Sequence, residues 1–156
     1  MCTVLKRFSA RRMLNDYWDG PYTRAARRHR VLDDPTTAQA LADWKAHVRA
    51  CWDGVAIAIA EPPVAEVFFG ETVTVRVEVV LNGLQPGDLV VECLFGRIRA
   101  DAGFETEQCV RLDLEEHSEV PVGVAYFVLV WPPGFCGLRR YRLRAYPWHE
   151  NLAHPF

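Results

Sequence analysis

The feature that most constrains the fold of this chain is a change of hydrophobic period near Val55. Between residues 72 and 81 apolar and polar side chains alternate, so that one face carries Val73, Val75, Val77 and Val79. A period of two is typical of a β-strand with one buried face. Before Val55, apolar residues recur instead at helical spacing. The chain is therefore expected to begin with helices and to continue with strands.

Further strand-like segments follow at intervals typical of an all-β domain. They are residues 55–59, 89–98, 109–115, 122–131 and 138–146. The segment 109–115 is expected to be one strand whose inward side chains are Val110, Leu112 and Leu114. The segment 122–131 is apolar on both faces, which predicts a central strand covered on both sides. Together the segments predict an immunoglobulin-like antiparallel β-sandwich.

Two N-terminal helices are expected before the sandwich. The first covers residues 13–30, where Gly20-Pro21 predicts a kink because proline removes a backbone donor. The second runs from about Thr37 to Cys51, with Thr36 or Thr37 as its N-cap. We place the domain boundary after this helix. Residues 1–52 are then a helical arm, and residues 53–156 are the sandwich domain.

Composition excludes several classes of function. The 156 residues are half hydrophobic and carry a net charge of −2, which gives no reason to expect nucleic acid as a partner. The chain contains no apolar run of about 18 residues, so no membrane span is expected. The first ten residues lack the pattern of a secretory signal, which predicts a cytoplasmic location. Five cysteines without CxxC spacing are interpreted as reduced thiols.

Catalytic and metal-binding patterns are not found in the sequence. The five histidines do not form HxxxH or HExxH spacings, and no GxSxG motif or phosphate-binding glycine loop occurs. Glu115 and Glu116 are adjacent in a strand-like segment and would point to opposite faces, unlike the paired carboxylates of a glycosidase. We therefore expect no catalytic, cofactor-binding or metal-binding residue in this chain.

Candidate binding residues lie near the two ends of the chain. Arg140, Arg142 and Arg144 form a row on one face of a predicted strand; the row could bind an anion, or pair with carboxylates on a neighbouring strand. Trp44 and Trp131 are expected in the core, whereas Trp18 and Trp148 are freer. Exposed tryptophans could stack on sugars or belong to a protein interface. The candidate contacts for a glucan or a protein partner are Trp18, Tyr22, Trp148, Arg140, Arg142 and Arg144.

Several motifs, in their order along the chain, resemble the C-terminal region of bacterial α-glucan (glycogen/maltodextrin) phosphorylases. The first two resemble the closing helix of the catalytic region in that family, and the third its Trp-Lys helix. The others resemble parts of the β-rich extension that follows. The motifs are Arg12-Met13 with Asp16-Tyr17, residues 22–28, residues 42–49, residues 70–75, residues 94–98 and residues 141–152. Gly20-Pro21 departs from the uninterrupted closing helix of the family.

The resemblance implies a part of a larger enzyme without its chemistry. The family holds pyridoxal phosphate on a lysine and splits α-1,4-glucosidic bonds with phosphate, but the lysine motif precedes the region matched here. The implied role is a non-catalytic C-terminal module that stabilises or docks on the catalytic lobes. Met13, Tyr17, Trp18 and Tyr22 would contact those lobes, unless they pair with a second copy of the chain. The alternative is an autonomous module that binds α-glucan or another protein.

Overall fold

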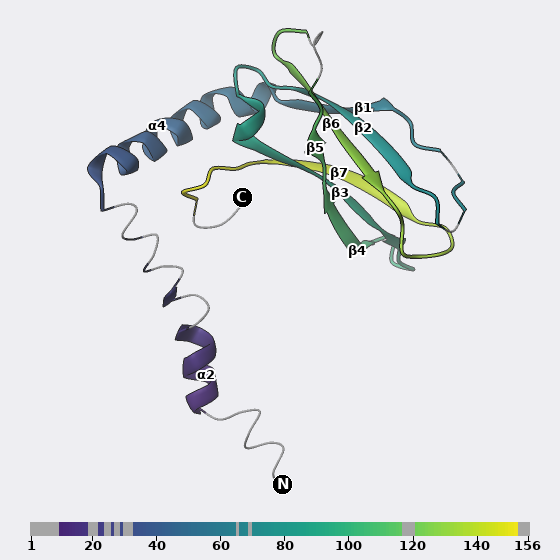
Figure 1. Ribbon diagram of the computed structural model, residues 1–156, viewed down its shortest axis with the longest axis horizontal. Helices are drawn as coiled ribbons and strands as arrows, with labels where there is room; N and C mark the ends of the chain where they lie inside the picture. Colours follow the sequence, from purple (N-terminus) through teal and green to yellow (C-terminus); the bar gives the residue numbers. More distant parts are fainter. Residues whose placement is uncertain are drawn as a thin grey trace. The chain divides into compact units, whose positions relative to one another are not determined.

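The computed structural model describes residues 10–18, 22–23, 26, 29, 33–64, 66–68, 70–116 and 121–152 (Figure 1). By their contacts the residues form two compact units. The first comprises residues 1–45 with 151–154, and the second comprises residues 46–150 with 155–156. The predicted boundary after residue 52 separates the helical arm from a segment expected to fold by itself. It stays a prediction.

Helix α2 spans Ala10–Tyr17 and helix α4 spans Pro35–Cys51, so helices precede the sheets as predicted. Gly20 and Pro21, the predicted kink, lie outside the described residues. The predicted N-cap of α4 is wrong, because Asp34 holds that position. Its carboxylate accepts the backbone N–H of Thr37 at 3.1 Å and the Thr37 hydroxyl at 2.7 Å. A carboxylate at this place satisfies N–H groups that have no partner within the helix.

The strands form two antiparallel sheets, which confirms the mainly β fold class. One sheet has the order β1-β2-β6-β5 and the other the order β4-β3-β7. The first contains β1 (Ala56–Glu61), β2 (Val73–Val80), β6 (Val124–Trp131) and β5 (Asp113–Leu114). The second contains β4 (Phe104–Arg111), β3 (Leu89–Ile98) and β7 (Arg140–Pro147). The immunoglobulin-like detail stays a prediction.

The core lies between the inner faces of these two sheets. Val75, Val77 and Val79 of β2 are fully buried, as their alternation predicts. The ring of Phe95, from β3, stacks on that of Trp131, from β6, with centroids 4.6 Å apart. Because these two strands belong to different sheets, the stack packs one sheet directly on the other.

The single strand predicted at residues 109–115 is wrong, because the chain changes sheets there. Strand β4 ends at Arg111 in one sheet, and β5 begins at Asp113 in the other. Leu112, between them, is buried and donates its N–H to the carbonyl of Val91 at 2.9 Å. Leu114, expected inward, is 47 % exposed. Because Leu112 is buried where the chain passes from one sheet to the other, the alternation of apolar and polar residues continues there. The sequence pattern therefore does not reveal that one strand ends and another begins.

Strand β6 is central, as predicted, but it is covered on one face only. Ala125, Phe127 and Leu129 are buried, whereas Val130 on the other face is 62 % exposed. On that outer face the guanidinium of Arg76 lies 4.9 Å from the centre of the Tyr126 ring. The apolar outer residues of β6 therefore do not indicate a second covering layer.

Candidate interaction surfaces

The first candidate surface lies on and just after helix α2. We call it the arm surface, and it consists of Met13, Leu14, Tyr17, Trp18 and Tyr22, all of them exposed. On α2, Tyr17 lies four residues after Met13 and three after Leu14, spacings that bring side chains together on one face of a helix. The rings of Tyr17 and Tyr22 meet edge to face at 6.5 Å. Trp18, a predicted contact, is 68 % exposed. Clustered exposed aromatic and apolar side chains are typical of an interface.

The arginine row on β7 divides into side chains with different partners. Arg144 faces Glu92 of β3 in the strand register and forms an ion pair with it. The hydroxyl of Tyr146 also donates to Glu92, at 2.9 Å. Burial raises the pKa of Glu92, but the hydrogen bonds from Arg144 and Tyr146 outweigh burial, so its pKa is lowered. The charge of Arg144 is therefore already engaged within the sheet.

The other two arginines of the row do not converge with Arg144. The guanidinium of Arg142 lies 4.4 Å from the ring centre of Phe104 on β4, an arrangement typical of a cation–π contact. Arg140, at the start of β7, is exposed. An anion-binding role for Arg140 and Arg142 stays a prediction.

Trp148 lies just after β7 and is held on one side. Its backbone N–H donates to the carbonyl of Asp88 at 2.8 Å. The guanidinium of Arg111 lies 6.0 Å from its ring centre, which occupies one face of the indole. The side chain is 39 % exposed, so part of it remains accessible to a ligand or partner.

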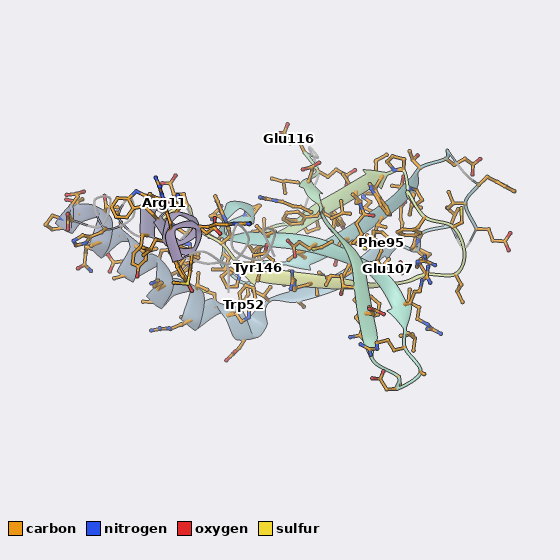
Figure 2. All side chains as sticks on the ribbon, turned by 90° about the horizontal axis from the view of Figure 1, so that it is seen from below. Arg11, Trp52, Phe95, Glu107, Glu116 and Tyr146 are labelled. Carbon is orange, nitrogen blue, oxygen red and sulfur yellow. The ribbon has the colours of Figure 1, made fainter. Side chains whose placement is uncertain are left out.

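A hollow of about 420 Å³, which no sequence pattern predicted, opens at one end of the sandwich. The stacked rings of Phe95 and Trp131 line it, and Phe135 approaches Trp131 at 5.5 Å. Phe68 and Leu138, at the rim, are 76 % and 87 % exposed. In Figure 2, Phe95 and Glu107 lie toward one end of their sheet, and Tyr146 lies toward the other. Pro62, Pro63 and Pro133 also line the hollow.

A histidine–cysteine pair on α4 was also missed. The Sγ atom of Cys51 lies 3.8 Å from Nδ1 of His47, and Nε2 of His47 lies 3.2 Å from the carbonyl oxygen of Gly83. The side chain of Asn82 donates to the carbonyl of Cys51 at 2.7 Å. The i, i+4 spacing of His47 and Cys51 was the feature of the sequence that could have predicted this pair. These bonds join the end of α4 to the Asn82-Gly83 turn, which gives the pair a structural role.

Within the described ranges, four cysteines carry free thiols: Cys51, Cys93, Cys109 and Cys136. Burial, together with the nearby Cys109, raises the pKa of Cys93 to about 12, so its thiolate is strongly disfavoured. The described residues include no group of three or more His, Cys, Asp or Glu side chains suited to a metal ion. No described helix is long and apolar enough to cross a membrane.

The described residues form a β-sandwich domain that carries exposed aromatic and arginine side chains. Residues 52–156 match the family model described as the glycogen phosphorylase C-terminal domain, and the chain belongs to this family. The resemblance stated from the sequence is thereby confirmed.

Curated relatives match nearly the whole chain. The chain is 28 % identical over 160 residues to maltodextrin phosphorylase of Thermococcus litoralis, covering 99 % of this chain and 18 % of that protein. It is also 28 % identical over 152 residues to glycogen phosphorylase of Mycobacterium tuberculosis, strains CDC 1551 and H37Rv, covering 92 % of this chain and 17 % of those proteins. The chain thus spans less than a fifth of the length of these relatives.

Proposed function

We propose that this chain is a non-catalytic C-terminal module of an α-glucan phosphorylase and that its arm surface docks on the catalytic lobes. Family membership supports the first half, because the match covers the C-terminal domain and not the rest of such an enzyme. The exposed aromatic residues of the arm surface carry the second half. In this proposal the lobes break down glycogen or maltodextrin in the cytoplasm, and pyridoxal phosphate is held by the lobes rather than by this chain.

The docking step has a physical reason in the arm surface. The arm surface exposes to water the apolar side chains of Met13, Leu14, Tyr17, Trp18 and Tyr22. Their burial would contribute a favourable free energy of roughly 25 cal/mol for each Å² of apolar area removed from water. Nε of Arg12 lies 3.6 Å from Oδ2 of Asp16, in an exposed i, i+4 ion pair. These two charged groups lie beside the apolar area. An apolar centre with a charged rim is typical of protein interfaces.

Hydrogen exchange over helix α2 tests the docking proposal. We expect fast exchange in a dilute solution of the chain alone, and slow exchange after addition of a phosphorylase catalytic region from the same organism. In Trp18→Ala, the concentration of catalytic region that gives half-maximal protection should rise at least tenfold. In Trp148→Ala it should stay unchanged, because that indole is less exposed and lies on another part of the chain. Strong protection in the chain alone, independent of its concentration, would refute the proposal. Protection that rises with chain concentration would identify a second copy as the partner instead.

Activity measurements test the non-catalytic half. The purified chain, incubated with maltodextrin, phosphate and pyridoxal phosphate, should form no glucose 1-phosphate above a heat-killed control. Product above that control would contradict the proposal.

A second candidate is an autonomous glucan-binding module, favoured by the accessible part of the Trp148 indole. Its discriminating measurement is a titration with maltoheptaose followed by tryptophan fluorescence. A saturable change that disappears in Trp148→Ala would support this candidate, and a flat titration would remove it.

A further inference from the structure

Strand β7 is an open edge of its sheet. Among the described strands only β3 pairs with it, in the order β4-β3-β7. In an antiparallel ladder, the backbone groups that do not bond to one neighbour point to the opposite side. Alternate residues of β7 therefore present their N–H and C=O groups along an edge that could accept another strand.

The layer opposite β1 is incomplete. Ile59 of β1 pairs with Val77 of β2, and Ile57 pairs with Val79, so the isoleucines share the inward face of the buried valines. Val77 and Val79 are fully buried, but Ile59 is 41 % exposed. Strand β1 is the edge of a four-stranded sheet that faces a sheet of three strands. Within the part of the chain that the structure describes, the inner face of β1 therefore lacks a full partner.

The hollow connects these two observations. Val64 and Phe68, from the segment after β1, line it together with Arg140 and Tyr141 at the start of β7. Its inner wall includes Val75 of β2. The hollow is therefore an apolar space that lies beside the start of β7 and also beside the segment that follows β1.

We propose that the edge of β7 accepts an extended partner strand in which acidic and apolar residues alternate. Strand addition takes its affinity from the backbone bonds and its specificity from alternate side chains. Residues opposite Arg140 and Arg142 would face outward, where a carboxylate would pair with Arg140 directly and with Arg142 once its guanidinium leaves the ring of Phe104 on β4. Residues opposite Tyr141 and Leu143, both half-buried, would face inward and cover apolar surface.

A second copy of β7 fits this edge poorly. Antiparallel pairing of two β7 strands would place arginines opposite arginines on the outer face, and like charges directly opposite one another destabilise a sheet. Arg144 is neutralised by Glu92, but Arg142 would still face an arginine of the copy, which is Arg140, Arg142 or Arg144 according to the register. Charge therefore favours an acidic partner strand. This inference does not depend on the docking of the arm surface.

The test uses the full chain and two synthetic eight-residue peptides, one alternating Glu and Val and the other alternating Lys and Val. Hydrogen exchange and amide chemical shifts are measured along β7 during titration. The Glu-Val peptide should slow exchange at alternate amides of β7, and the Lys-Val peptide should bind at least tenfold more weakly. Arg142→Glu should invert this preference. Arg99→Glu, in the exposed turn before β4, should leave it unchanged.

Each outcome decides the proposal. Absence of protection at millimolar peptide, equal binding of the two peptides, or protection confined to β4 would overturn it. Protection of β7 that rises with chain concentration in the absence of peptide would assign the edge to a second copy and would also overturn it. If Arg142→Glu fails to fold by circular dichroism, Arg140→Glu, at the exposed start of the strand, serves as the charge reversal.

Discussion

Shortening Val77 to alanine should destabilise the sandwich markedly, while the same change at Val130 should not. Both valines lie on adjacent central strands of one sheet, so each substitution carries a similar cost in β-propensity. Val77 is fully buried between its register partners Ile59 and Phe127. Val130 is 62 % exposed. The difference between the two variants therefore isolates the burial of two methyl groups.

The expected size follows from that burial. Each buried methylene contributes about 0.8 kcal/mol, so Val77→Ala loses about 1.6 kcal/mol by transfer alone. The cavity left behind raises the loss to about 2–3 kcal/mol. Val130→Ala should cost less than about 0.5 kcal/mol, as is usual for surface positions.

Urea unfolding followed by near-ultraviolet circular dichroism measures both losses, since Trp131, stacked on Phe95, contributes to the signal. Val77→Ala should lower the midpoint without changing the slope against urea concentration. In a thermal scan it should lower Tm by roughly 4–8 °C for each kcal/mol lost. Equal losses for the two variants would refute the assignment of the inner face of β2 to the core.

Three further outcomes are expected. A fragment of residues 53–156 should unfold cooperatively without the arm, and a broad transition without a baseline would contradict this. The lowered pKa of Glu92 gives stability that is present above its ordinary pKa of 4.5 and is lost as pH falls through the lowered value; the stability gap between the wild type and Glu92→Gln should therefore shrink on acidification, and a gap that widens would reverse the sign. In the folded protein at pH 8 a thiol reagent should label exposed Cys136, and should label buried Cys93 only after unfolding, as mass spectrometry would show.

Local patterns predicted those strands whose neighbours bury one consistent face. The alternation along residues 72–81 located β2 and its inward valines because both adjacent strands place their apolar residues on the same side. The same reasoning failed for β4 and β5. Leu112 is buried at the crossing between sheets, so alternation continued through a point where the strand itself ends.

The interaction surfaces were only partly accessible to prediction. Exposure of Trp18 followed from the sequence, where it was expected to be freer than the core tryptophans. The partner of Arg144 did not, because Glu92 lies 52 residues away and meets it only through the register of two strands. The hollow could not be predicted either, since segments more than 60 residues apart build it, as Phe68 and Leu138 illustrate.

The order of strand pairing also has a consequence for synthesis on the ribosome. The pairs β1–β2 and β3–β4 emerge first, but they belong to opposite sheets. Their long-range partners β6 and β7 begin only at Val124 and Arg140. Until those strands leave the exit tunnel, the valine face of β2 has no complete layer to pack on, and such faces and edges are prone to aggregation. A translational pause just before Val124 would therefore prolong the period in which the nascent chain depends on chaperones.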